Sequence, residues 1–172
     1  LEDWDHAVNR GATILAEIIG YGSSSDHSHL IRPDASGQVY AMQRALTDAR
    51  ISADDVDYIN MHGTATKEGD PSEILAIKTL FGERAKSLPV SATKSMHGHM
   101  MGATGAVESV LTVMALMNDR LPPTAHLEKL DPSCDGVQHI RNEALIKSGA
   151  KIGLSNSFAF GGSNAVLVFR NV

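Results

Sequence analysis

His62 and His99 are the side chains in this sequence best suited to stabilising a negatively charged oxygen. His62 ends an apolar run, and His99 directly precedes a long apolar helix. The N-terminus of a helix carries partial positive charge, which disfavours a protonated imidazole. A neutral imidazole can donate one hydrogen bond to a developing oxyanion, and each such donor is worth about 2.7 to 4 kcal/mol. The two histidines therefore predict an enolate or oxyanion site.

Glu108 predicts a buried ion pair close to these histidines. It lies in the middle of the most apolar segment of the chain, where an unpaired carboxylate costs several kcal/mol. Lys94 lies on the loop that enters the same helix, so a pair between Lys94 and Glu108 is the simplest solution. A purely structural pair without a part in catalysis is the alternative.

Zinc binding is the competing chemistry. His97 and His99 alternate along the chain, which places both rings on one side of an extended segment. They could join His62 or Asp26 as zinc ligands. The positive charge of Lys94 nearby disfavours a divalent cation, so this hypothesis is the weaker of the two.

The composition indicates the cellular compartment of the protein and excludes several classes of partner. The single cysteine, Cys134, excludes a disulfide framework and fits a reducing compartment, and no residue stands in a nucleophile elbow. The chain has 15 basic and 20 acidic residues without a Lys/Arg-rich run, which argues against nucleic-acid binding. No stretch reaches the roughly 20 apolar residues that span a bilayer, and the first residues are too charged for a signal peptide. We expect a cytoplasmic protein with no membrane segment.

The elements that position these side chains alternate between strands and helices. Residues 70–73 are expected to cap a helix, with Glu73 as the capping-box glutamate. Residues 101–117 are apolar on nearly every side and predict a central, closely packed helix. Expected strands are 13–19, 56–61, a short run near Val90, 152–158 and 165–169, expected helices are 37–49, 70–81 and 101–117, and 23–29 is a polar loop.

This order predicts an α/β layered domain whose functional loops gather at the carboxyl ends of the strands. His62, Lys94 and the 158–162 loop all follow strands, so we expect them to converge on one edge of the sheet. With 172 residues and 42% hydrophobic residues, the chain suits one compact domain. Because it starts at Leu1 rather than Met, we expect it to belong to a longer polypeptide.

Three motifs together resemble the C-terminal half of an elongating β-ketoacyl-acyl-carrier-protein synthase, a family of fatty-acid and polyketide synthesis. They are residues 61–66 with 69–70, residues 92–99 with 102–108, and residues 155–164. They occur in the order and spacing of the family, and the likeness spans essentially the whole chain. The resemblance implies a thiolase-like α/β/α fold with a mixed sheet, in which residues 1–172 are the second of two similar halves.

The resemblance also implies a reaction and its partners. In this family a cysteine in the first half, which is absent from this chain, is acylated by acyl carrier protein. Malonyl-carrier protein is then decarboxylated, and the resulting carbanion attacks the thioester. The implied partners are acyl carrier protein with its phosphopantetheine thioesters, the protein's own N-terminal half, and a second copy in a homodimer. No cofactor or metal is implied, and residues 1–172 alone are expected to be inactive.

By the same resemblance, His62 and His99 would stabilise the enolate, while Lys94 would be the family's lysine, held by Glu108. The residues that would contact the substrate are Thr64 and Thr66 at the pantetheine and Phe160 as a gating aromatic beside the cysteine.

Two positions depart from the family pattern. His97 stands where the family commonly has Thr, and we expect it to alter the hydrogen bonding or titration of His99. Ala159 replaces a glycine between two phenylalanines. Because a side chain restricts positive φ, we expect the opening of this loop to differ.

Other functions remain as alternatives. Thiolases share the fold, but the catalytic cysteine of their second half is missing here, which argues against thiolytic cleavage. A chain-length factor or a decarboxylase-like homologue keeps the histidines or the fold and loses the cysteine of the first half. A histidine-ligated metal hydrolase and a non-catalytic docking or dimerisation module are the remaining hypotheses.

Overall fold

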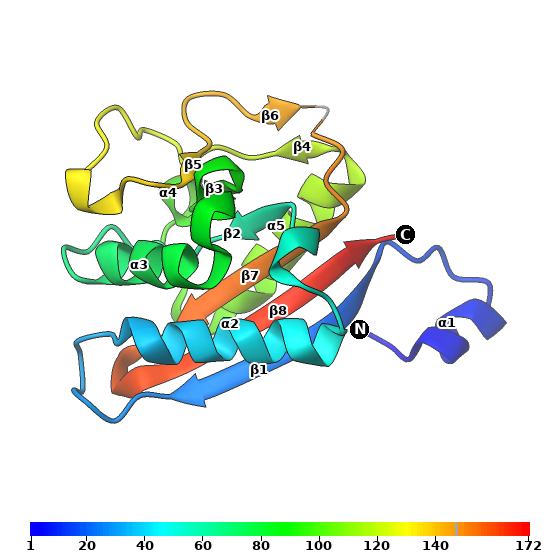
Figure 1. Ribbon diagram of the computed structural model, residues 1–172. Helices are drawn as coiled ribbons and strands as arrows, with labels where there is room; N and C mark the ends of the chain where they lie inside the picture. Colours follow the sequence, from blue (N-terminus) through cyan, green and yellow to red (C-terminus); the bar gives the residue numbers. More distant parts are fainter. Residues whose placement is uncertain (147) are drawn as a thin grey trace.

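A mixed six-stranded sheet forms the centre of the computed structural model, which describes residues 1–146 and 148–172 (Figure 1). Its strand order is β1 (Ala16–Ser25), β8 (Ser163–Asn171), β7 (Ile152–Phe158), β2 (Tyr58–Asn60), β3 (Pro89–Ser91) and β5 (Gln138–His139). β8 runs antiparallel to β1 and β7, whereas β7, β2, β3 and β5 are mutually parallel. A separate two-stranded sheet joins β4 (Arg120–Leu121) to β6 (Leu145–Ile146). The predicted α/β layered fold with a mixed sheet is confirmed.

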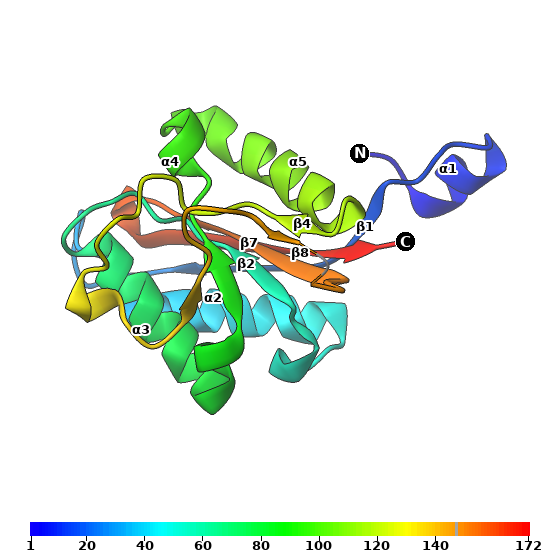
Figure 2. The same cartoon turned by 90° about the horizontal axis from the view of Figure 1, so that it is seen from above.

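Helices cover both faces of the sheet. Figure 2 shows α2 (Ala35–Ala49) and α3 (Gly69–Phe81) on one face and α5 (Thr104–Met117) on the other. α1 (Trp4–Asn9) projects from the body, and α4 (Lys94–His97) is a single turn. Short 3-10 turns occur at Ala53–Asp55, Gly82–Ser87, Met101–Ala103, Pro132–Cys134 and Phe160–Gly162. No helix within the described ranges is long and apolar enough to cross a membrane.

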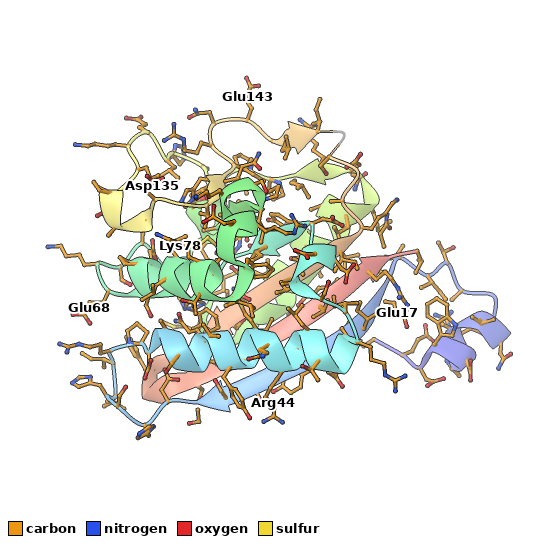
Figure 3. All side chains as sticks on the ribbon, in the orientation of Figure 1. Glu17, Arg44, Glu68, Lys78, Asp135 and Glu143 are labelled. Atoms are coloured by element: carbon orange, nitrogen blue, oxygen red, sulfur yellow. The ribbon has the colours of Figure 1, made fainter. Side chains whose placement is uncertain are left out.

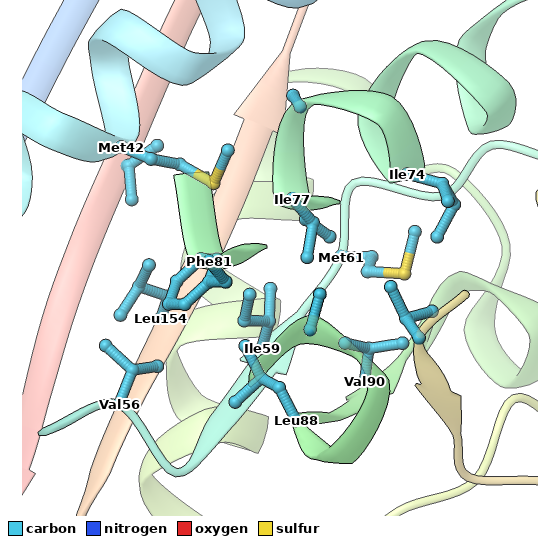
Figure 4. Close-up of a cluster of buried hydrophobic side chains, with 14 of the residues drawn as sticks. Met42, Val56, Ile59, Met61, Ile74, Ile77, Phe81, Leu88, Val90 and Leu154 are labelled. Atoms are coloured by element: carbon cyan, nitrogen blue, oxygen red, sulfur yellow. The ribbon is translucent and has the colours of Figure 1, made fainter. Parts of the chain in front are cut away.

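The main hydrophobic core lies between the sheet and the α2–α3 layer. Met42 of α2 and Ile77 of α3 meet Ile59 and Leu154 from the central strands in one buried cluster (Figure 4). A smaller cluster around Leu116 packs on the opposite side with α5. This three-layer burial fixes the central strands, and therefore the loops that leave their carboxyl ends.

The first strand is longer than the sequence pattern predicted. It begins at Ala16 and continues through Gly20 and Gly22 to Ser25, so both predicted bounds of the strand at 13–19 were wrong, as was the predicted start of the loop at residue 23. A Cβ atom at Gly20 would lie 2.4 Å from the Ala45 carbonyl oxygen of α2. These glycines therefore permit a close approach between helix and strand, and they do not end the strand.

Two features of the helices also differ from expectation. α3 begins at Gly69, and its N-cap Glu68 makes no side-chain capping bond, so the predicted capping box at residues 70–73 was wrong. α5 buries one side against the sheet, but Val110, Met114 and Met117 on its outer side are exposed. Within residues 1–146 and 148–172, the sheet is the only layer that packs against α5. The predicted close packing of this helix on nearly every side is therefore absent from this part of the chain.

The contact between α2 and β1 predicts a large stability effect at Gly22. A Cβ there would lie 2.0 Å from the Ala41 carbonyl oxygen, and backbone cannot move aside cheaply. Overpacking typically costs about 1 to 3 kcal/mol, so Gly22→Ala should lower the free energy of unfolding by at least that amount in chemical denaturation. Ser25→Ala, exposed on the same strand, should change it by less than about 0.5 kcal/mol. An unchanged unfolding free energy for Gly22→Ala would show that α2 does not lie against β1.

Candidate functional site

The loops after three neighbouring parallel strands meet at one edge of the sheet, as predicted. His62 follows β2, Lys94 follows β3, and Phe158 ends β7. The ring centroids of His62 and His99 are 5.6 Å apart with the planes at 85°, and Phe158 lies 5.9 Å from His62. The two predicted histidine rings therefore lie side by side in a perpendicular arrangement, with the ring of Phe158 next to His62.

The predicted ion pair between Lys94 and Glu108 is present and buried. Nζ of Lys94 lies 2.6 Å from Oε1 of Glu108, and the two side chains are 5% and 1% exposed. Most charged side chains, such as Arg44 and Glu143, point to solvent instead (Figure 3). Burial raises the pKa of Glu108, and the hydrogen bond and charge of Lys94 oppose that shift.

Lys94 also fixes the main chain of His62. Its Nζ donates a second hydrogen bond, of 2.5 Å, to the His62 carbonyl oxygen. One ammonium group thus joins α5, through Glu108, to the loop that carries His62. Because a buried cation needs its partners, this arrangement is more constrained than a surface ion pair.

The electrostatics of His62 keep its ring uncharged. Burial is the largest of three effects that lower the pKa of His62 to about 3, followed by the charge of Lys94 and the neighbouring His99. Nδ1 is buried and has no hydrogen-bond partner among the residues that the structure describes. The ring is therefore neutral throughout the physiological pH range.

Hydrogen bonds define the tautomer of His99. Its Nδ1 accepts a hydrogen bond of 3.0 Å from the backbone N–H of Met101. A backbone N–H can only donate, so Nδ1 is the acceptor and carries no proton. A neutral His99 ring must therefore carry its proton on Nε2. The site accordingly offers an N–H donor on His99 beside the neutral ring of His62.

Glu73 is a site residue, although the sequence predicted it as a capping-box glutamate of a helix. Its carboxylate accepts the backbone N–H groups of His62 and Gly63, each at 2.9 Å, and the Nδ2 group of Asn156 at 3.0 Å. Burial raises the pKa of Glu73 to about 7, while these hydrogen bonds act in the opposite direction. A glutamate within the apolar run of residues 73–77 was the signal that could have revealed a buried partner.

Asp70 shapes the loop that carries the two predicted threonines. Its carboxylate accepts the N–H of Ala65 at 3.1 Å, which supports a left-handed backbone at that residue, with φ of 58°. The hydroxyl groups of Thr64 and Thr66 lie 3.2 Å apart on either side of it. Both threonine hydroxyls are therefore brought together on this loop, next to His62 in the chain.

The Phe160 loop differs from expectation in one respect. Ala159 has φ of −128° and ψ of 161°, which is ordinary extended backbone, so the predicted conflict between its side chain and a positive φ does not arise here. Gly161 and Gly162 make the turn instead, with φ of 79° and 76°. Phe160 itself is 79% exposed, and among the described aromatic contacts Phe158 is the phenylalanine that meets His62.

His97, which the zinc hypothesis requires as a ligand, makes its hydrogen bonds to other groups. The Nδ1 atom of His97 lies 2.7 Å from the Gly98 carbonyl oxygen, and Nε2 lies 3.3 Å from Thr93 Oγ1. None of these hydrogen bonds reaches His99, and the expected effect of His97 on His99 stays a prediction. Within residues 1–146 and 148–172, no group of three His, Cys, Asp or Glu side chains is arranged to hold a metal ion.

Comparisons with known proteins agree on one family. Residues 15–128 match the family described as beta-ketoacyl synthase, C-terminal domain. A protein named nodulation protein E from Rhizobium meliloti is 45% identical over 174 residues, covering 100% of this chain and 42% of the relative. The 3-oxoacyl-(acyl-carrier-protein) synthase 2 of Coxiella burnetii is 48% identical over 174 residues, with the same two coverages of 100% and 42%.

Solved structures give the same result. A beta-ketoacyl synthase from Burkholderia phymatum has a TM-score of 0.94 and 44% identity, covering 99% of this chain and 41% of that one. The ishigamide ketosynthase/chain length factor has a TM-score of 0.94 and 36% identity, with coverages of 99% and 41%. This chain therefore spans well under half the length of these similar proteins.

The hydrogen bonds of Glu73 predict that Glu73→Gln is harmful despite its similar shape. The glutamine NH2 group would face a backbone N–H of His62 or Gly63, so a buried donor would lose its acceptor. The free energy of unfolding should fall by about 1 to 3 kcal/mol, measured by urea denaturation. Glu83→Gln, on an exposed side chain, is the matched control and should change it by less than about 0.5 kcal/mol. Equal effects of the two substitutions would contradict this role for Glu73.

The low pKa of His62 predicts an unusual titration. The unfolded chain binds a proton at this ring near pH 6.5, whereas the folded protein binds it only near pH 3. The stability that comes from a neutral His62 is therefore complete above about pH 6.5 and is lost as the pH falls towards 3. Proton NMR of the histidine Cε1–H signals, assigned by comparison with His62→Gln, should show no titration of His62 between pH 5 and 8. A midpoint near 6.5 would refute the assignment.

Proposed function

The chain belongs to the β-ketoacyl synthase family, as the C-terminal domain, and from this we propose that the complete protein is a β-ketoacyl-acyl-carrier-protein synthase. It would extend an acyl thioester with a unit from malonyl-carrier protein, with loss of CO2, in fatty-acid or polyketide synthesis. The observation that carries this proposal is the pair of facing imidazoles, one with its pKa lowered to about 3 and the other with its proton on Nε2. Such a pair suits an enolate oxygen better than a metal or a proton-transfer step.

In the proposed reaction the bond between the malonyl carboxylate and its methylene carbon breaks, and CO2 leaves. The electron pair remains as an enolate, with its negative charge on the thioester oxygen. Hydrogen bonds from the rings of His62 and His99 would stabilise this oxygen. The enolate carbon then attacks the acyl-cysteine thioester, a carbon–carbon bond forms, and the cysteine leaves as thiolate.

The nucleophilic cysteine would come from outside residues 1–172. Cys134 is buried, and burial raises the pKa of its thiol, which disfavours the reactive thiolate. Residues 1–172 on their own should therefore catalyse no condensation. Lys94 would act on His62 rather than on the substrate, through its charge and its bond to the His62 carbonyl oxygen.

Substrate contacts are proposed at the rim of the site. Thr64 and Thr66 have neighbouring hydroxyls on a loop directly after His62, a placement that suits the amide groups of a pantetheine arm. Phe160 is exposed on the loop after β7 and would gate the acyl-cysteine. The thioester would be delivered by acyl carrier protein.

The N-terminal half of the same protein is the proposed cover for α5. Its outer side presents the exposed apolar residues Val110, Met114 and Met117. The similar proteins are more than twice as long as this chain, which leaves room for a second half of comparable size. A homodimer of the complete protein and a cytoplasmic location remain predictions from the family resemblance and the composition.

The two proposed steps can be separated in the complete protein. His62→Ala and His99→Ala should each slow malonyl decarboxylation by roughly a hundred- to a thousandfold, because each removes a donor to the enolate. Acylation of the cysteine, followed by mass spectrometry, should stay within a few-fold of the unaltered protein. His6→Ala, on the exposed α1, is the control and should leave both steps unchanged.

Equal losses in acylation and decarboxylation would contradict the assigned histidine roles. Decarboxylation without any acylation in the unaltered protein would identify a chain-length-factor or decarboxylase-like homologue instead. Stoichiometric zinc in the purified protein, lost together with activity on chelation, would favour the hydrolase alternative.

A further inference from the structure

Thr104, the first residue of α5, places a buried hydroxyl against the ring of His99. The residue is 4% exposed. Its Oγ1 lies 3.0 Å from Nδ1 of His99 and accepts the backbone N–H of Met100 at 2.8 Å. The hydroxyl is therefore shared between the ring and the loop that connects the ring to the helix.

The direction of the bond between Thr104 and His99 follows from the other partners. A threonine hydroxyl has one hydrogen to donate, and Met100 N–H already occupies an acceptor position on Oγ1. On the ring side, the N–H of Met101 reaches the same Nδ1 atom at 3.0 Å and can only donate. Nδ1 is thus an acceptor, and the Thr104 hydrogen, when it points to the ring, shares the single lone pair of Nδ1 with the Met101 N–H.

The loop between His99 and Thr104 needs such support. Gly98 has φ of 72°, and Met101 has φ of 50°, a left-handed conformation that is unfavourable for a residue with a side chain. This bend is what turns the Met101 amide towards His99. By accepting the neighbouring Met100 N–H, Thr104 holds the bend and contacts the ring at the same time.

We propose that Thr104 is a positioning residue for His99. It fixes the orientation of the ring and, together with the Met101 amide, holds the proton on Nε2. Thr104 acts through His99 and does not touch the substrate. The catalytic consequence rests on the proposed function, in which Nε2–H is the donor to the enolate, whereas the tautomer itself does not.

Kinetics of the complete protein test this role. Thr104→Val keeps the shape and removes the hydroxyl, and it should lower kcat for malonyl decarboxylation roughly three- to tenfold, with KM changed less than about twofold. Thr104→Ser restores the hydroxyl and should stay within about twofold of the unaltered protein. Thr47→Val, an exposed threonine on α2, is the matched control and should have no effect. Thr104→Ala is a second hydroxyl-free variant should Thr104→Val fail to fold.

Nitrogen NMR gives a readout that does not depend on turnover. With 15N-labelled histidine, the His99 signals, assigned by their loss in His99→Gln, should show Nδ1 without a proton and Nε2 with one. In the hydroxyl-free variants the Nδ1 shift should move, because one of the two donors that share its lone pair is gone. Thr104→Ser should retain the original shift.

The outcomes separate the two proposals. Wild-type rates and unchanged shifts in a folded hydroxyl-free variant would overturn the role of Thr104, and so would a proton on Nδ1 in the unaltered protein. A His99→Ala variant that decarboxylates at the wild-type rate would instead overturn the proposed function. The tautomer measurement would still decide whether Thr104 holds His99.

Discussion

The buried ion pair between Lys94 and Glu108 is the interaction on which the site depends. A carboxylate in the apolar layer under α5 must keep a cationic partner, because losing that partner leaves an uncompensated charge and typically costs about 3 to 5 kcal/mol. Lys94 meets this requirement and, with the same ammonium group, binds the His62 carbonyl oxygen. The need to satisfy one buried charge therefore places the loop of a catalytic candidate against a helix on the far side of the sheet.

The same principle recurs on the opposite side of His62. Glu73, from the α2–α3 layer, gathers the amides of His62 and Gly63 with its two oxygens. His62 is thus held from one side by a cation at its carbonyl oxygen and from the other by a carboxylate at its N–H. Loops are usually the most mobile parts of a fold, and attachment to two packed helices gives this one the rigidity that a binding site needs.

Different physical effects set the state of the two histidine rings. For His62, burial and the nearby positive charge of Lys94 penalise the protonated ring. For His99, donors at Nδ1 leave the proton of the neutral ring on Nε2. Both effects use groups that the fold has already positioned, so the proposed reaction would require no reorganisation of either ring. The outer side of α5, with Val110, Met114 and Met117, stays exposed and apolar within the described residues.

The sequence by itself determined the main alternation of strands and helices, although it missed α1, β4, β5 and β6. It also determined the convergence of His62 and Lys94 on one edge and the partner of Glu108. Those features follow from local periodicity and from the cost of burying a charge, both of which can be judged without coordinates. Only the tertiary structure decided that Glu73 serves the His62 loop rather than a helix cap, and that Gly20 lies inside a strand. It also decided that Ala159 is extended and that His97 lies within hydrogen-bond distance of Gly98 and Thr93. These outcomes depend on which helix packs against which strand, and a local pattern carries no information about partners that are distant in the chain.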